Sequence, residues 1–281
     1  MIDGGDGTGD VAAFSGAMGR YTVELNADGT VNVVDRQTDG DGTDHVQNVE
    51  TLNFTQGATI FTDGNLDLSI IEGSSGLSSE QIEVFVELYI AYFNRAPDAL
   101  GLYFWGSAFA NGTTLEETAA LFLNQDETRA TYPPEADNLS FATQVYSNVL
   151  GRIPDQDGLN FWVSVLDSGA VSRDQFILEV LQGAKAAPPD GATSEFIALQ
   201  QGDQAFLANK TDIGIYYSVI KGLSDVSDAS AAMMMYDRED TSTIQDAVDQ
   251  IDLNATAAEA ADSGELLLKL VGVTDDPFAM V

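Results

Sequence analysis

Apolar and polar residues alternate along the first part of the chain, which is the pattern of a half-buried β-strand. Apolar side chains occupy every second position at 21–25 and again at 31–33. The turn sequence Asn-Ala-Asp-Gly stands between the two runs, so we expect them to form a β-hairpin. Residues 1–72 are therefore predicted to form a β-rich module with Asp/Gly loops.

The spacing of apolar residues becomes helical after the Gly/Ser stretch 73–76, which is expected to be a linker. From Ile82, apolar residues recur at i, i+3, i+4 and i+7, which is the spacing of one helix face. Helical spacing continues through 78–190 and through 191–281. The sequence thus predicts an α+β protein with a small N-terminal β region, a mainly helical repeat region and a helical C-terminal region.

The helical region contains an internal repeat. Residues 89–105 align with residues 146–162 at a constant offset of 57 residues. Both copies carry Arg-x-Pro-Asp-x-x-Gly followed by Phe-Trp, and a capping box then opens a further helix in each copy. A repeated unit usually buries its apolar face against a neighbour. We therefore predict two helical units, at about 78–134 and about 135–190.

The Arg and Asp of each corner, Arg95 with Asp98 and Arg152 with Asp155, are interpreted as structural residues rather than catalytic ones. Arg near a helix C-terminus complements the helix dipole, Pro ends the helix and Asp can cap the next one. The chain has only 11 basic residues, so two Arg at equivalent positions indicate a shared ion-pair role. No residue is assigned a catalytic role.

The Phe-Trp pair of each unit has two interpretations. Aromatic residues at helical spacing usually belong to the core, and this interpretation is favoured for Trp105 and Trp162. The alternative is a stacking platform for a sugar ligand, which predicts that at least one of the two indoles lies exposed in a groove.

Composition narrows the classes of function. The 281 residues include 45 acidic and 11 basic side chains, which gives a formal net charge of −34. This charge repels nucleic acids and anionic membrane surfaces, and it attracts divalent cations. The chain has no Cys and a single His, which excludes disulfides, thiolate nucleophiles and multi-His metal centres. No run of about twenty apolar residues occurs, so no membrane-spanning helix is expected.

Two loops rich in Asp and Gly are the strongest candidates for chemistry. Calcium takes oxygen ligands on flexible backbone; Asp supplies the charge and Gly permits the necessary turns. From Asp39 the EF-hand template fits in part, but Asp44 stands where that template requires Gly, so an EF-hand is rejected. We predict bound Ca²⁺ in at least one loop; the alternative is that both loops are ordinary Asp-Gly turns. The predicted metal ligands are Asp3, Asp6, Asp10, Asp39, Asp41 and Asp44.

Two families are similar to parts of this sequence. Residues 4–10 (Gly-Gly-Asp-Gly-Thr-Gly-Asp) resemble the nonapeptides of RTX (repeats-in-toxin) proteins, with Gly9 as an extra residue, and the segments up to Phe54 resemble a module that often follows such repeats. The repeated units resemble the helical domain of unknown function numbered forty-two fourteen, which occurs in secreted bacterial proteins and is distantly similar to phycobilisome linker domains. Residues 151–162 (Gly-Arg-x-Pro-Asp-x-x-Gly-x-x-x-Trp) carry this second resemblance, and Asn94 replaces the leading Gly in the first copy.

These resemblances imply type I secretion from a Gram-negative bacterium, with an uncleaved signal within 191–281, and folding that depends on extracellular calcium. The acidic and then apolar tail 275–281 suits such a signal. The favoured function is an extracellular or cell-surface calcium-binding protein, not an enzyme, with a structural, adhesive or surface-layer role. Its expected partners are calcium and either further copies of itself, a cell-surface polysaccharide or another surface protein. Two alternatives stay open: a polysaccharide-binding or accessory module of a secreted enzyme, and a halophilic acidic enzyme.

Overall fold

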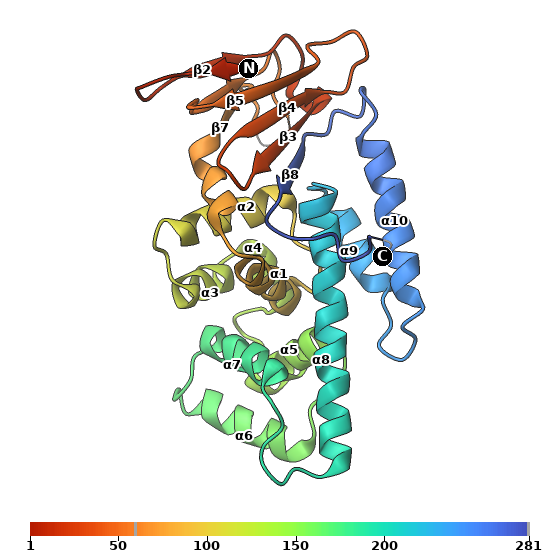
Figure 1. Ribbon diagram of the computed structural model, residues 1–281. Helices are drawn as coiled ribbons and strands as arrows, with labels where there is room; N and C mark the ends of the chain where they lie inside the picture. Colours follow the sequence, from red (N-terminus) through yellow and green to blue (C-terminus); the bar gives the residue numbers. More distant parts are fainter. Residues whose placement is uncertain (59–60, 280–281) are drawn as a thin grey trace.

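The computed structural model of this chain describes residues 1–58 and 61–279. It confirms the predicted α+β class, because strands dominate the N-terminal part and helices the rest. Figure 1 shows the strands gathered at one end of the molecule, with the helices stacked beneath them. Residues 267–271 return to the strand-rich end and join its larger sheet, while the C-terminus lies beside α9 and α10.

Two sheets make up the strand-rich end. The larger has the order β1-β5-β4-β3-β8 and the smaller the order β2-β6-β7. The predicted hairpin is the antiparallel pair β3 and β4, in which Val23 lies opposite Val33. Both valines are buried, which explains the alternation seen in the sequence. The strands are β1 (Ile2–Asp3), β2 (Val11–Ala13), β3 (Tyr21–Asn26), β4 (Val31–Asp35), β5 (Thr43–Gln47), β6 (Thr51–Asn53), β7 (Asn65–Asp67) and β8 (Leu267–Val271).

Strand β8 corrects the expectation that the C-terminal region is helical throughout. It runs parallel to β3, with Thr22 opposite Leu267 and Leu25 opposite Leu270. The leucines of β8 at 267, 268 and 270 are at most 2% exposed. A short continuous apolar run of this kind fits a strand covered on both faces as well as it fits a buried helix. Pairing with a partner more than 200 residues earlier decides between the two.

The helices follow the boundaries that the capping signals predict. Ser78 with Gln81 and Thr114 with Glu117 form capping boxes at the starts of α1 and α3. At the start of α7 the Ser172 backbone N–H donates to the Gln175 side chain at 3.1 Å. The helices are α1 (Ser79–Phe93), α2 (Ala99–Ala110), α3 (Leu115–Leu123), α4 (Asp126–Thr131), α5 (Asn138–Leu150), α6 (Gln156–Asp167), α7 (Arg173–Lys185), α8 (Ser194–Ile215), α9 (Val226–Met235) and α10 (Thr243–Ala258).

The repeat in the sequence appears as two successive three-helix runs, α1–α2–α3 and α5–α6–α7. The residue after the first helix of each run has left-handed backbone: Asn94 has a φ of 53° and Gly151 a φ of 65°. Asn tolerates this conformation better than most residues other than Gly. This explains why Asn94 can replace the leading Gly of the motif without changing the corner.

Helix α8 ties the two runs together. It packs against α1, α5 and α7, and Figure 1 shows it as a long rod beside both runs. Lys210 in this helix is 3% exposed, and its amine donates to the Asn94 side chain at 2.5 Å and to the Asn148 carbonyl at 3.0 Å. The Lys210 side chain thus joins Asn94, just after α1, to Asn148, near the end of α5, which are corresponding regions of the two runs.

The stretch 73–76 is packed rather than a free linker, contrary to the sequence interpretation. It lies in the 3₁₀ turn Glu72–Gly76, which contacts α2. Ser74 is fully buried, and its backbone N–H donates to the Ser107 hydroxyl at 3.2 Å. Small residues are needed here because Gly73 lies directly against Ser107. The β module and the first helical run therefore share a packed junction.

Candidate functional site

The first predicted calcium loop is folded onto the end of β5 and the residue after it. Asp3 accepts hydrogen bonds from the Gly5 backbone at 3.0 Å and from the side chains of Gln47 and Asn48 at 2.7 and 2.9 Å. The bond from Asn48, followed by those from Gln47 and Gly5, lowers the pKa of Asp3. Asp3 therefore holds the loop to the neighbouring strand.

Glu50 organises the same loop, although it is not among the predicted metal ligands. Its carboxylate accepts the backbone N–H groups of Gly9 and Asp10, each at 2.7 Å. The Asp10 carbonyl in turn accepts the N–H groups of Glu50 and Thr51 at 3.2 and 3.1 Å. The rejected EF-hand template that starts at Asp39 places Glu50 at its twelfth position, but the partners of Glu50 in the structure lie about forty residues earlier in the chain.

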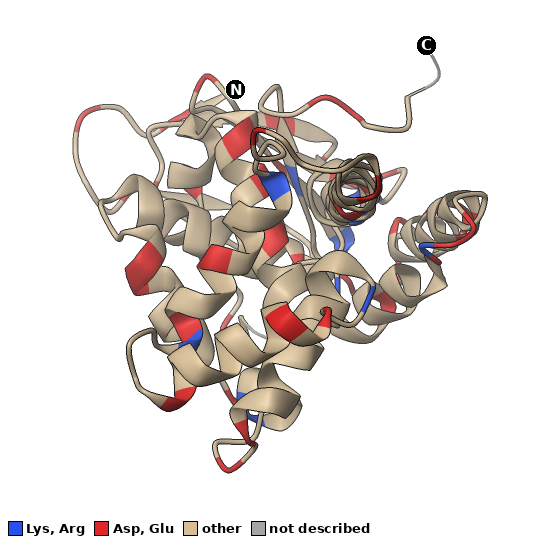
Figure 2. Ribbon diagram, turned by 90° about the horizontal axis from the view of Figure 1, so that it is seen from below, with Lys and Arg blue, Asp and Glu red and all other residues tan. Residues whose placement is uncertain are grey.

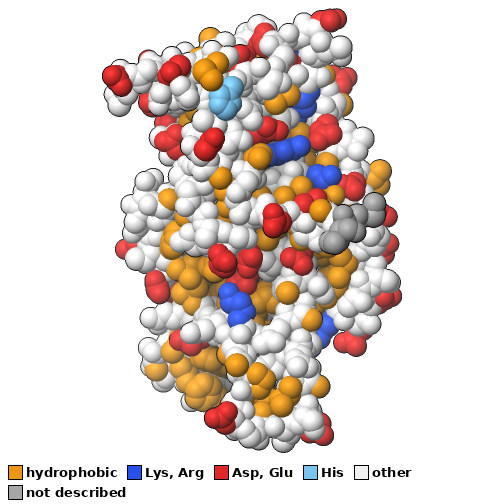
Figure 3. Space-filling view, in the orientation of Figure 1, with side chains coloured by type: hydrophobic (Ala, Val, Ile, Leu, Met, Phe, Trp, Pro, Cys, Tyr) orange, Lys and Arg blue, Asp and Glu red, His pale blue; other side chains and the backbone are white. Residues whose placement is uncertain are grey.

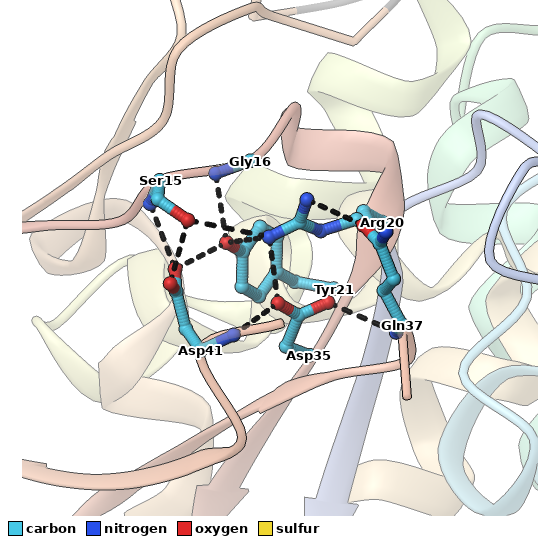
Figure 4. A network of polar contacts seen from close by, with 7 residues as sticks. All are labelled: Ser15, Gly16, Arg20, Tyr21, Asp35, Gln37 and Asp41. Carbon is cyan, nitrogen blue, oxygen red and sulfur yellow. Dashed lines mark hydrogen bonds and ion pairs between the residues drawn. The ribbon is translucent and has the colours of Figure 1, made fainter. Parts of the chain in front are cut away.

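Asp41 of the second loop is bound to the protein by three hydrogen bonds (Figure 4). Its carboxylate accepts from the Ser15 backbone at 2.7 Å, from the Ser15 hydroxyl at 2.6 Å and from the Tyr21 hydroxyl at 2.6 Å. The bonds from Ser15 and then Tyr21 lower the pKa of Asp41 to about 2. Burial, with the bond to Asp41, raises the pKa of Tyr21 to about 12.

A buried ion pair holds the second Asp/Gly loop in place. The Arg20 guanidinium lies 2.6 Å from the Asp35 carboxylate, and the side chain of Asp35 is fully buried. Asp35 also accepts the backbone N–H groups of Gln37 at 3.0 Å and of Asp41 at 2.6 Å. Figure 4 shows Arg20 between Asp35 and the Tyr21 hydroxyl, to which it donates at 3.0 Å. Sequence analysis missed both Arg20 and Asp35, since neither belongs to an Asp/Gly run.

The other four predicted ligands are Asp6, Asp10, Asp39 and Asp44. Within the described residues no hydrogen bond or ion pair reaches their carboxylates. Across 1–58 and 61–279, no three acidic or His side chains stand close enough together to form a ready-made metal site. A cation in either loop would thus have to draw these carboxylates together.

The first corner is built around a buried guanidinium. Arg95 is 3% exposed and donates to both carboxylate oxygens of Glu127, at 2.7 and 2.8 Å. Asp98 lies 3.5 Å from Arg95 and caps α2 by accepting the Gly101 N–H at 2.7 Å. Arg95 thus joins the end of α1 to α4, while Asp98 starts the next helix.

The second corner uses a different carboxylate. Arg152 donates to Asp203 of α8 at distances from 2.7 to 3.1 Å, and Arg238 lies 2.8 Å from the same carboxylate. Asp203 is 4% exposed. Asp155 caps α6 through the Gly158 N–H at 2.8 Å. The corner therefore connects α5, α8 and the loop after α9.

The two Trp residues occupy equivalent positions against the core. The Trp105 ring centroid lies 5.1 Å from that of Phe122, and the Trp162 centroid lies 5.0 Å from that of Phe176. Both indoles are half-buried, while the Phe before each is 45% or 59% exposed. Trp105 also lines a surface hollow of about 440 Å³. Trp105 therefore packs against the core and can also be reached by a ligand from solvent.

A known family matches the second run together with the end of the first. The family model described as Domain of unknown function (DUF4214) matches residues 119–187. A DUF4214 domain is present there. It begins within α3 and ends just after α7, so it contains Arg152, Asp155 and Trp162. No curated protein and no solved structure matches the chain.

The DUF4214 family has no assigned chemistry. Arg152 and Asp155 bind protein groups and leave no free reactive pair at the corner. Among the described residues, no helix is long and apolar enough to cross a membrane.

Proposed function

We propose that this chain is a secreted or cell-surface acidic protein that binds Ca²⁺ and has a structural, adhesive or matrix role. The observation that carries the proposal is the set of four loop carboxylates on Asp6, Asp10, Asp39 and Asp44. They lie near one another in sequence in two loops, and the described structure gives them no partner. Ca²⁺ is the hard cation that takes such oxygen ligands from flexible loops.

The backbone of the first loop supports the proposal. Gly5, Gly7 and Gly9 have φ values of 82°, 151° and 100°, which residues with a Cβ seldom adopt. Backbone with these φ values can point its carbonyl groups toward a bound ion. Closing the loop around Ca²⁺ would offset part of the self-repulsion of a chain with net charge −34.

The proposed location rests on resemblance. RTX-like loops imply export through a type I channel, in which the chain stays unfolded where calcium is scarce and folds outside the cell. We also propose that residues 78–134 form a second unit of the DUF4214 type, because their corner repeats the pattern of Arg152 and Asp155. The two units would present their exposed side chains to a partner on the surface. Figure 3 shows hydrophobic side chains gathered over the lower helices.

The test is thermal unfolding, followed by circular dichroism, in chelator and then with added Ca²⁺. We expect Ca²⁺ at about 1–10 mM to raise Tm by at least about 5 °C, since extracellular calcium sites bind in the 10⁻⁴–10⁻³ M range. The variant Asp6→Asn with Asp10→Asn should lose much of this shift. The matched control is Asp190→Asn, because Asp190 is also exposed and also precedes a Gly with positive φ. It should keep the full shift.

Salt is the necessary second control. Acidic residues also lie on many helices, as Figure 2 shows, so any cation can stabilise the fold by screening. Mg²⁺ at the same concentration and NaCl at the same ionic strength should give smaller shifts than Ca²⁺. Equal shifts from all three salts would contradict the calcium proposal and favour a halophilic protein.

A further inference from the structure

A surface hollow beside the first corner has the composition of a ligand site. Its volume of about 440 Å³ falls within the range of about 300–1,000 Å³ that small-molecule sites occupy. Aromatic rings form one part of its wall, and amide and carboxylate side chains form the other. The lining residues are Tyr89, Phe93, Arg95, Trp105, Phe122, Asn124, Gln125, Asp126 and Glu127.

Two polar groups of the aromatic wall have no partner in the described structure. Tyr89 is 4% exposed, and no hydrogen bond acts on its hydroxyl, whose pKa burial raises. The indole N–H of Trp105 also lacks an acceptor among the described residues. Neither atom is sealed from solvent. Each group is therefore open to a hydrogen bond from a ligand in the hollow.

The equivalent tyrosine of the second run lies in a more open place. Tyr146 and Trp162 are both half-buried, whereas Tyr89 is 4% exposed. Burial of the tyrosine hydroxyl therefore differs between the two runs, although they share the same motif.

The charges of the hollow select the class of ligand. The Nε and one terminal nitrogen of Arg95 are bound by Glu127, and the other terminal nitrogen donates to the Ala96 carbonyl at 2.8 Å. All three nitrogens of the guanidinium therefore donate to protein groups, which leaves Arg95 poorly placed to bind an anionic ligand. Asp126 at the rim is fully exposed and lies 3.8 Å from Arg129, so these two charges offset each other, and the net charge of −34 of the whole chain disfavours anionic ligands. A neutral ligand with hydroxyl groups and an apolar C–H face fits best.

We propose that this hollow binds a neutral saccharide, whose ring lies against Trp105 and whose hydroxyls bond to Tyr89 and to the amides of Asn124 and Gln125. Aromatic side chains offer a broad apolar face together with a polar edge. The amides of Asn124 and Gln125 each donate one N–H to a carbonyl of α3, at 2.9 and 3.2 Å, so each keeps its second N–H and acceptor capacity on its oxygen for a ligand hydroxyl. This site goes beyond the proposed calcium-dependent role, because none of the predicted calcium ligands takes part in it.

Trp fluorescence provides a direct test, because the chain has only two Trp residues. In Trp162→Phe the emission comes from Trp105 alone, and in Trp105→Phe it comes from Trp162 alone. Each full-length variant is titrated with cellotetraose, maltotetraose and tetra-N-acetylchitotetraose, and with tetragalacturonate as an anion of similar size. We expect a saturable change of Trp105 emission with at least one neutral sugar at up to 10 mM, and a response at least about tenfold weaker to tetragalacturonate.

The matched variants are Tyr89→Phe and Tyr146→Phe, each in the Trp162→Phe background. Loss of one neutral hydrogen bond should weaken sugar binding about two- to tenfold in Tyr89→Phe. Binding should stay unchanged in Tyr146→Phe, since Tyr146 lies in the other run. The proposal is overturned if no neutral sugar changes Trp105 emission, if Trp162 responds equally, or if both Tyr variants weaken binding alike. Because the calcium test reads Tm, either proposal can fail without the other.

Discussion

The Tyr21 hydroxyl donates a hydrogen bond of 2.6 Å to the Asp41 carboxylate, and this bond joins a buried strand to an exposed loop. The bond from the Ser15 hydroxyl, followed by this one, lowers the pKa of Asp41 to about 2, and burial together with this bond raises the pKa of Tyr21 to about 12. Asp41 therefore adds stability above its ordinary pKa of 3.8, and this stability is lost as the pH falls through about 2. Tyr21 adds stability below pH 10, which is lost as the pH rises through about 12.

We expect Tyr21→Phe to lower the free energy of unfolding at pH 7 by about 1–2 kcal/mol, because Asp41 loses one of its three donors. Urea unfolding of Tyr21→Phe, Asp41→Asn and the double variant forms a thermodynamic cycle. The double variant should be more stable than the sum of the single losses predicts. Strictly additive losses would show that the two groups do not interact.

Lys210 should make stability depend on pH in the neutral and mildly alkaline range. Burial lowers its pKa from 10.5 to about 7, so between these values the unfolded chain binds a proton that the folded chain lacks. Stability therefore rises with pH across this window, by at most about 1.4 kcal/mol per pH unit. The groups that face its amine, Asn94 and Asn148, are uncharged. Urea unfolding from pH 6.5 to 9.5 should show this slope in the natural chain and a flatter one in Lys210→Met. Identical slopes would contradict the assignment.

Asp203 should be among the most sensitive carboxylates in the helical region. Its removal in Asp203→Ala leaves Arg152 and Arg238 without their shared partner, and we expect a loss of about 3 kcal/mol. Asp155→Ala removes only a helix cap from the same corner and should cost about 1 kcal/mol. Chemical denaturation of both variants checks this order. If Asp155→Ala lowered the free energy of unfolding as much as Asp203→Ala, the ion pairs of Asp203 would contribute no more to stability than a helix cap.

Strand β8 should be required for the stability of the β module. Leu268 is 1% exposed, so Leu268→Ala should lower the free energy of unfolding by about 2–5 kcal/mol. Val271 ends the same strand but is 43% exposed, and Val271→Ala should change stability by less than about 1 kcal/mol. Denaturant unfolding distinguishes the two. Comparable losses would mean that position along the strand, rather than burial, sets the cost.

The elements that the sequence predicts well are those whose signals are local. The hairpin at Val23 and Val33 and the helix start at Ser78 follow from alternation, a turn and a capping box within a few residues. The parts it misses depend on distant partners. Nothing near Glu127 or Asp203 distinguishes these two from the other 43 acidic residues as partners of an Arg.

The same reason limits prediction of the candidate sites. The Asp/Gly loops are visible because six Asp residues cluster in sequence, but the structure commits Asp3 and Asp41 to protein groups. The hollow at Trp105 depends on the packing of α4 across the end of α1. This packing cannot be predicted from the sequence of either helix alone. Chemistry that assembles from several helices becomes visible only once their packing is known.

The parallel pairing of β3 with β8 sets an order of events for a chain that grows from its N-terminus. Residues 22–26 are made early, yet the strand that covers them, 267–271, is made about 245 residues later. Until 267–271 pairs with it, β3 is an edge of the larger sheet, with backbone N–H and C=O groups open to other chains. A hairpin that forms before β8 arrives therefore needs another protection against pairing with other chains, and the high density of negative charge provides one.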